Sequence, residues 1–165
     1  MAEYGHRKVA LVTGGTRGIG AAISRRLAAA GVAVAMLYRD RADEAEALVA
    51  ELTAAGAEAL AMQADVSDLA SLSAAIDTVA NRFGGLDILV NNAGLAIAGP
   101  LADYLPDAFD RVFAVNVRAP FYAAQQAAAL MRDGGRIVTI GSIVAARAPA
   151  PESPCTRRAS RRWQA

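Results

Sequence analysis

The sequence has almost none of the residues that build metal centres and disulfide frameworks. Cys155 is the only cysteine and His6 the only histidine among 165 residues. One thiol cannot form an internal disulfide or a thiolate metal site, and one imidazole cannot supply a ligand cluster. We therefore expect no bound metal and no disulfide.

Long hydrophobic runs and a strong net charge are also lacking. No apolar run approaches the roughly 20 residues that span a membrane, and Met1–Lys8 lacks the apolar core of a signal peptide. The net charge is only +1, and the positive excess lies in the four arginines of Glu152–Ala165. A nucleic-acid-binding face is not supported for the rest of the chain. These absences predict a cytoplasmic protein with no nucleic-acid or membrane partner.

Short apolar runs alternate with segments of helical periodicity, in a chain that is 55% hydrophobic and 20% charged. The runs do not alternate strictly between apolar and polar residues, which favours strands buried on both faces. We predict an α/β domain with a doubly wound parallel sheet and helices on both sides. A turn at Asp133-Gly134-Gly135 is expected before the last strand. The expected strands are Lys8–Thr13, Val32–Tyr38, Glu58–Gln63, Leu86–Val90 and Arg136–Ile140, and the expected helices are Gly18–Ala30, Arg41–Ala55, Asp68–Phe83 and Asp107–Arg132.

The stretch Thr13–Gly20 lies between the first strand and the first helix and carries glycines in the spacing G-x-x-x-G-x-G. Such glycines let the backbone turn sharply, approach a pyrophosphate and place that anion at a helix N-terminus. A glycine-rich turn without a ligand is the alternative. Ligands of doubly wound sheets bind beyond the carboxyl ends of the strands, where this turn lies.

Four more motifs follow in order: Asp65-Val66 after the third strand, Asn91–Gly94 after the fourth, Asn116 in the long helix, and Ser142 after the fifth. Together with Thr13–Gly20 they resemble the short-chain dehydrogenase/reductase family over residues 8–151. The resemblance implies a Rossmann-type sheet of order 3-2-1-4-5, incomplete at the C-terminus, with Arg136–Ile140 at its edge, and an intact parent protein that is a homo-oligomer.

The same resemblance implies the site residues. Ser142 and Asn116 would be catalytic, and Asp65 and Val66 would contact adenine. The cofactor-binding set would be Gly14, Thr16, Arg17, Gly18, Ile19, Gly20, Arg39, Asp65, Val66, Asn92, Ala93 and Gly94. Taken singly, Asp65 is equally a turn or cap residue, Asn91–Gly94 a plain turn, and Ser142 a loop hydroxyl.

Asn116 lies on a predicted helix stripe with Phe109, Val112 and Phe113, so its amide should point inward and find partners. A satisfied core amide is the alternative to a catalytic role. Pro120 has no N–H to donate to the carbonyl of Asn116, so we expect that carbonyl to be free and the helix to be irregular there. In the family, such an irregularity exposes this carbonyl to a water on the proton-relay path.

Cofactor choice depends on the end of the second strand, where an acidic side chain would bind the ribose hydroxyls of NAD. Tyr38 occupies that position, Arg39 follows it, and Arg17 lies in the glycine turn. Two guanidinium groups favour a 2′-phosphate, so we predict NADP(H) rather than NAD(H). Asp40 is a competing partner for Arg39. The alternative to phosphate binding is that both arginines are solvated surface charges.

Family members act through a tyrosine and a lysine four residues later, and this pair is missing at the family position. Of the four tyrosines only Tyr4 has a lysine at that spacing, and Lys8, the sole lysine, precedes the first strand. Without a proton donor, general acid catalysis worth ~10²–10⁴ in rate is lost. We expect catalysis by the chain as written to be absent or vestigial.

The composition changes where the pair is missing, dividing the chain into a domain of residues 1–151 and a basic tail of residues 152–165. A shifted reading frame can be built by joining the third base of one residue's codon to the first two bases of the next codon. In that frame the Cys155 and Thr156 codons allow Tyr, and the Ala159 and Ser160 codons allow Lys. We therefore expect a C-terminally truncated, frame-shifted chain, with the switch between about Arg147 and Glu152. A genuine basic tail that binds nucleic acid or a membrane surface weakly is the alternative.

Together, the motifs and the family resemblance predict an NADP(H)-dependent oxidoreductase that acts on a small-molecule carbonyl or alcohol. It resembles 3-oxoacyl-[acyl-carrier-protein] reductases and related ketoreductases. The alternative is a non-catalytic NADP(H)-binding fragment, since the glycine turn, Arg17, Arg39, Asp65 and Asn92 are all present.

Overall fold

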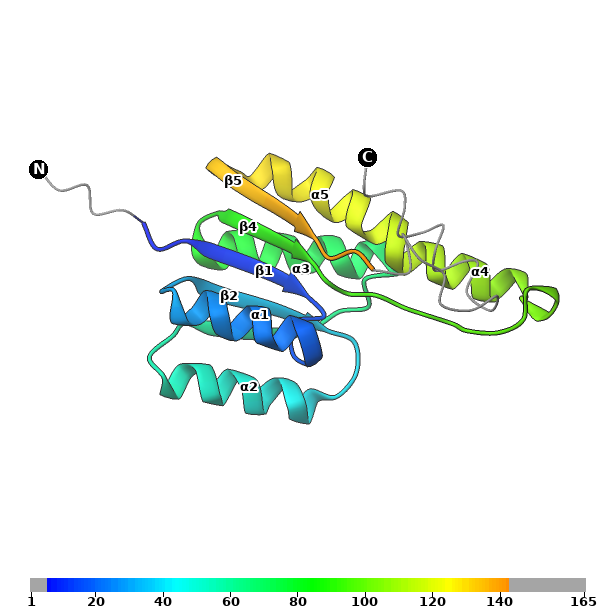
Figure 1. Cartoon of the computed structure of the whole chain (residues 1–165). Helices are drawn as coiled ribbons and strands as arrows, with labels where there is room; N and C mark the ends of the chain where they lie inside the picture. Colours follow the sequence, from blue (N-terminus) through cyan, green and yellow to red (C-terminus); the bar gives the residue numbers. More distant parts are fainter. Residues whose placement is uncertain (1–5, 143–165) are drawn as a thin grey trace, which may run out of the picture.

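The computed structural model describes residues 6–142, which form a three-layer α/β fold around one parallel sheet (Figure 1). The strand order is β3-β2-β1-β4-β5, which confirms the order that the family resemblance implied. The elements are β1 (Val9–Thr13), α1 (Gly18–Ala29), β2 (Ala33–Tyr38), α2 (Ala42–Ala54), β3 (Ala59–Gln63), α3 (Leu69–Phe83), β4 (Leu86–Asn91), the short 3-10 helix η1 (Leu101–Asp103), α4 (Pro106–Phe113), the π-helical η2 (Ala114–Arg118), α5 (Ala119–Leu130) and β5 (Met131–Thr139).

The sheet separates two apolar cores because successive side chains of a strand point to opposite faces. Leu11 of β1 packs with Leu72 and Ile76 of α3 in the larger core, whereas its neighbour Val12 packs with Leu48 of α2 in the smaller one. Figure 1 shows α1 and α2 on one face and α3 and α5 on the other. Burial on both faces explains the near-continuous apolar strands in the sequence.

Helix α3 follows the periodicity in the sequence. Its apolar residues Leu72, Ile76 and Val79 recur at helical spacing and are buried. The Asp68 side chain caps the helix by accepting a hydrogen bond from the N–H of Ala70 at 3.0 Å. At the other end Gly84 adopts φ +70°, a left-handed conformation that glycine takes without strain. No helix within residues 6–142 has the length and apolarity to cross a membrane.

The long helix expected over Asp107–Arg132 is divided into three parts. Helix α4 ends at Phe113, the π-helical η2 takes the next five residues, and α5 ends at Leu130. The irregularity expected at Asn116 is therefore confirmed, and the helical region stops two residues earlier than predicted. Pro120 lies in the first turn of α5, where its missing N–H removes one helical hydrogen bond to the preceding turn.

Strand β5 begins at Met131, five residues before the predicted start at Arg136. It pairs Met131 with Leu86 and then Arg136 with Ile88, and the extra residues of β5 form an irregularity within the strand. The predicted Asp133-Gly134-Gly135 turn lies in this irregularity, where Gly134 has φ +81°. Among the described strands β5 is at one edge of the sheet. Its side chains Ile137 and Val138 are exposed, as is Ile140, which follows the strand.

Asp87 of β4 joins three segments at the edge of the sheet opposite the glycine turn. Its Oδ2 accepts hydrogen bonds from the N–H of Val9 and from Arg132 Nη1, both at 2.7 Å, and its Oδ1 lies 3.0 Å from His6 Nε2. Arg132 also donates to the carbonyl of Phe83 at 2.8 Å. Burial alone raises the pKa of Asp87, but the hydrogen bonds from His6 and Val9 and the charge of Arg132 outweigh it and hold the pKa below its ordinary value.

We predict that Asp87→Asn lowers the free energy of unfolding by about 3 kcal/mol at pH 7, because it leaves Arg132 half-buried without its carboxylate. A depressed carboxyl pKa stabilises the fold above the unfolded value of about 3.9, and this stabilisation is lost as pH falls through the folded value. The wild type should therefore lose stability from about pH 4 downwards, with a shallower decline in the variant. Urea unfolding between about pH 2.5 and 7 measures both.

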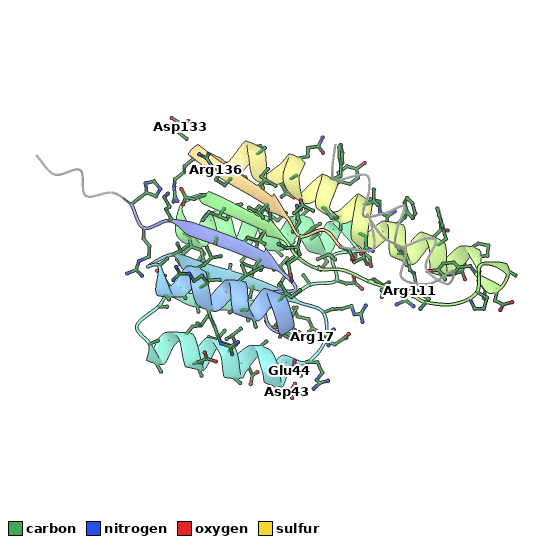
Figure 2. The ribbon with its side chains drawn as sticks, viewed as in Figure 1. Arg17, Asp43, Glu44, Arg111, Asp133 and Arg136 are labelled. Carbon is green, nitrogen blue, oxygen red and sulfur yellow. The ribbon has the colours of Figure 1, made fainter. Side chains whose placement is uncertain are left out.

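The matched control is Asp133→Asn, an exposed position in the irregular part of β5 (Figure 2). It should keep the wild-type acid dependence. Equal acid dependence of Asp87→Asn and the wild type would show that Asp87 does not carry this effect.

Candidate nucleotide-binding site

A cleft of about 700 Å³ lies at the carboxyl ends of β1 to β4. It combines the glycine turn, the end of β2, the β3–α3 loop and the segment after β4. The structure brings together here all twelve residues of the predicted cofactor-binding set, and their binding of a cofactor stays a prediction. Leu37, Tyr38, Asp40, Arg41, Ala64, Leu95 and Val115 also line the cleft.

Of these additional residues, Leu95 and Val115 had no signal in the sequence. Leu95 follows the Asn91–Gly94 motif by one position, and Val115 belongs to η2, on an element far away in the sequence. Periodicity in the sequence does not distinguish an apolar side chain that lines a cleft from one that packs in the core. Only the packing of η2 against the strand ends assigns Val115 to the cleft.

The glycine turn has no room for side chains at its contact points. Gly14 has φ +62° and Gly18 φ +53°. A Cβ placed on Gly20 would overlap the carbonyl oxygen of Gly14 and lie 2.6 Å from Nδ2 of Asn92. The first turn of α1 is therefore pressed directly against the end of β1, which brings backbone close to the cleft.

Asn92 and Thr13 cross-link β4 to the glycine turn. The Asn92 side-chain Nδ2 donates to the carbonyls of Thr13 and Gly14, both at 3.0 Å. In return, Thr13 Oγ1 accepts from the backbone N–H groups of Asn92 and Ala93, also at 3.0 Å. The segment Asn91–Gly94 is thus more than a turn, because it fixes the conformation of the glycine loop.

The N-terminus of α1 faces the cleft and favours an anion there. The helix begins at Gly18, and its first turn holds no acidic residue. Gly18, Ile19 and Gly20 all line the cleft, and Ile19 is 66% exposed. The unpaired N–H groups and the positive end of the helix dipole are suited to a phosphate.

Arginines surround the same cleft. Arg39 Nε donates to Asp40 Oδ2 at 2.7 Å, and this hydrogen bond together with the charge of Asp40 raises the pKa of Arg39. Within residues 6–142 no salt bridge engages Arg17, whose side chain extends from the start of α1 (Figure 2). Arg41 has φ +69° at the start of α2 and pairs with Glu44 at 2.5 Å. Arg17 and Arg39 thus both line the cleft, where a dianion would compete with Asp40 for Arg39.

Asp65 forms a compact turn after β3. Its Oδ1 accepts hydrogen bonds from the N–H of Ser67 at 2.9 Å and from Ser67 Oγ at 2.7 Å. Burial alone raises the pKa of Asp65, but the two Ser67 bonds and the charges of Arg39 and Arg111 outweigh it, so the pKa lies below its ordinary value. Asp65 is therefore a turn residue, which was the alternative considered from the sequence. It also lines the cleft.

The side chain of Asn116 is bonded to the backbone of Leu95. Oδ1 accepts from the Leu95 N–H and Nδ2 donates to the Leu95 carbonyl, each at 2.8 Å. The amide is therefore satisfied, and it fixes the loop that follows Asn91–Gly94. The expected inward stripe holds for Val112, which is fully buried, but is wrong for Phe109, which is 40% exposed and stacks on Phe113. Exposure of the Asn116 main-chain carbonyl to water stays a prediction.

Ser142 lies at the same edge of the sheet as Asn91–Gly94. The N–H of Ile140 donates to the carbonyl of Asn91 at 2.9 Å, which continues the β4–β5 pairing to the strand ends, and Ser142 follows two residues later. Its side chain is half-buried. The structure thus places Ser142 and the predicted cofactor segment on one side of the molecule, and its catalytic role stays a prediction.

No described tyrosine is paired with a lysine. Tyr38 ends β2, Tyr104 donates its hydroxyl to the carbonyl of Ile97 at 2.7 Å, and Tyr122 lies exposed on α5. Lys8 directly precedes β1 at the opposite edge of the sheet. Tyr4 and the predicted frame-shifted tail, residues 152–165, lie outside the described residues. No group of three His, Cys, Asp or Glu side chains that could hold a metal occurs in the part of the chain that the structure describes.

Comparison with known proteins agrees with this geometry. Residues 8–155 match the short chain dehydrogenase family, and the chain belongs to that family. It is 44% identical over 135 residues to the versicolorin reductase stcU of Emericella nidulans, covering 82% of this chain and 51% of that protein. It is 41% identical over 136 residues to a probable tetrahydroxynaphthalene reductase of Zymoseptoria tritici, with the same coverage. The chain thus spans about half the length of the curated relatives it matches.

Solved structures are similar over most of the chain. A blue fluorescent protein from a metagenomic library, in complex with NADPH, is 47% identical with a TM-score of 0.91, covering 94% of this chain and 64% of that one. A short chain dehydrogenase from Burkholderia cenocepacia, in complex with NADP, is 49% identical with a TM-score of 0.91, covering 93% and 63%.

We predict that Gly20→Ala disrupts the glycine turn, because the added methyl group overlaps the Gly14 carbonyl. Overpacking against backbone costs ~1–3 kcal/mol or more, so the midpoint of thermal unfolding should fall by several degrees. Gly99→Ala is the control, since a Cβ there meets no atom within 4 Å. Equal melting temperatures for the two variants would contradict the close contact between α1 and β1.

Proposed function

We propose that residues 8–142 form the NADP(H)-binding part of an oxidoreductase that transfers a hydride between NADP(H) and a small-molecule carbonyl or alcohol. The observation that carries the proposal is the pair Arg17 and Arg39 on the rim of one cleft, with Tyr38 at the strand end where an NAD-binding protein has an acid. Bound NADPH would supply the hydride.

The residues of the cleft fit this cofactor. The N-terminus of α1 and its glycines would hold the pyrophosphate, and Arg17 and Arg39 would bind the 2′-phosphate with charge-assisted hydrogen bonds. Asp65 and Val66 would contact the adenine ring. Asn92, Ala93 and Gly94 would lie beside the rest of the cofactor, on the side of the molecule where Ser142 follows β5.

NADP(H) is favoured over NAD(H) by charge. Asp40 already neutralises part of Arg39, through the hydrogen bond at 2.7 Å. A 2′-phosphate dianion at this place would compete with Asp40 for the guanidinium, whereas the neutral ribose of NADH would gain little from it. The NADPH and NADP complexes of the similar structures support the same choice.

We predict that Arg39→Ala weakens NADPH binding by about tenfold and leaves NADH binding nearly unchanged, because only NADPH has the 2′-phosphate. Asp40→Asn should tighten NADPH binding by removing a competing anion. Fluorescence titrations with NADPH and with NADH measure the two dissociation constants for each variant.

Arg25→Ala, which removes an exposed pair with Glu51 on the outer face of α1 and α2, is the control and should change neither affinity. A preference of the wild type for NADH, or equal losses for both cofactors in Arg39→Ala, would refute the role of Arg39.

The chemical step would use Ser142 and Asn116. Ser142 would donate a hydrogen bond to the substrate oxygen, and Asn116 would hold the Leu95 loop beside the cofactor through its two bonds of 2.8 Å. A carbonyl that accepts a hydride must also receive a proton, and no tyrosine–lysine pair stands in residues 6–142 to deliver it. We therefore propose that this chain binds NADP(H) without turnover.

For the intact protein we propose a ketoreductase resembling 3-oxoacyl-[acyl-carrier-protein] reductases and acting as a homo-oligomer. The relatives are named as reductases, which supports the reducing direction. Activity is measured as NADPH oxidation with 3-oxoacyl thioesters and simple ketones.

We further propose that the missing pair is encoded in another reading frame. The family match ends at Cys155, the residue whose codon can supply the first base of a tyrosine codon. Sequencing the gene should reveal Tyr-x-x-x-Lys downstream of codon 151. An absence of that motif from all forward frames would exclude the frame shift, and the chain made in the restored frame should gain NADPH-dependent ketone reduction.

A further inference from the structure

The backbone of Gly15 is fixed from both sides in the interior by hydrogen bonds to its N–H and to its carbonyl. Its N–H donates to the carbonyl of Leu37 at the end of β2, at 3.1 Å. Its carbonyl accepts a hydrogen bond from Ser24 Oγ of α1, at 2.9 Å. Ser24 and Leu37 are both fully buried. The glycine turn is therefore fixed at Gly15 by the end of β2 on one side and by α1 on the other.

Ser24 has no evident purpose within its own helix. Serine is a poorer helix former than alanine by about 0.5 kcal/mol, and the buried face of α1 is otherwise made of Gly20, Ala21 and Ala28. Its hydroxyl does not bond to the preceding helical turn but reaches the loop nine residues earlier. A buried hydroxyl on a face of small apolar residues is thus explained by its bond to Gly15.

The bond determines how the next peptide group is oriented. The Gly15–Thr16 peptide is trans and planar, so the N–H of Thr16 points away from the Gly15 carbonyl. Because that carbonyl points to Ser24 inside the fold, the N–H of Thr16 is turned to the other side, and Thr16 lines the cleft. If Ser24 lost its hydroxyl, the carbonyl would be buried without this donor and the peptide could rotate.

We propose that Ser24 is a positioning residue for phosphate recognition: its hydroxyl sets the Gly15–Thr16 peptide so that the turn presents its N–H groups to the pyrophosphate, a role that rests on the proposed binding of NADP(H). Ser24 itself touches no ligand. It acts on the pyrophosphate end of the cleft and not on the 2′-phosphate end, which Arg17 and Arg39 serve.

The test compares two probes, NADPH and adenosine 2′-monophosphate, by calorimetric titration of the full chain. Adenosine 2′-monophosphate carries the 2′-phosphate but no pyrophosphate. Ser24→Ala should weaken NADPH by about tenfold, the loss expected when one bond to a charged group is misaligned. It should change the affinity for adenosine 2′-monophosphate by less than about twofold. Thr78→Ala removes a similar hydroxyl-to-carbonyl bond, to Ala74 on α3, and should change neither affinity.

The outcomes separate the two proposals. Equal weakening of both probes in Ser24→Ala, or a loss of structure in its circular dichroism, would show a merely structural serine and overturn the positioning role. Unchanged binding of NADPH to Ser24→Ala would overturn it as well. If the wild type bound adenosine 2′-monophosphate but not NADPH, or bound neither, the proposed NADP(H) site would fail and the positioning role with it.

Discussion

The exchange of hydrogen bonds between Thr13 and Asn92 is the constraint on which the rest of the site depends. Two backbone N–H groups converge on one threonine hydroxyl, and one asparagine amide spans two successive carbonyls of the glycine turn. Four bonds between strand ends hold a loop that has few side chains of its own. Buried or half-buried polar networks of this kind are stabilising only when every member is paired, so each residue type here is restricted by its partner.

The π-helical segment η2 extends the same organisation to the other side of the cleft. Asn116 binds the Leu95 backbone, Arg118 donates to the carbonyl of Ser67 at 3.1 Å, and Asn91 Nδ2 donates to the carbonyl of Pro120 at 3.4 Å. The segments that follow β3 and β4 are therefore attached to η2 and to the first turn of α5. π-Helical turns cost stability and persist where function or packing holds them, and here the packing partners are the segments that form the cleft.

The two ends of the sheet differ in the kind of interaction that holds them. At the amino ends the charged group Asp87, with Arg132 and His6, joins β1, β4 and β5. At the carboxyl ends most of the bonds are between amides, hydroxyls and backbone, and the Asp65 carboxylate is held by Ser67. Arg17 and Arg39 also line the cleft and add positive potential for an anionic ligand.

The sequence by itself determined the order and type of the elements, the glycine turn and the motifs at four strand ends. These follow from local physics: apolar periodicity, glycine conformations and the rule that parallel strands end at one edge. It did not reveal that β5 begins at Met131, since an irregular strand containing Asp-Gly-Gly has the composition of a turn.

Tertiary structure alone decided the rest. Val115 and Leu95 belong to the cleft because η2 packs against it. Ser24 bonds to the glycine turn because its hydroxyl faces the carbonyl of Gly15. Each of these depends on which distant backbone atom a side chain meets, and periodicity along one segment contains no such information.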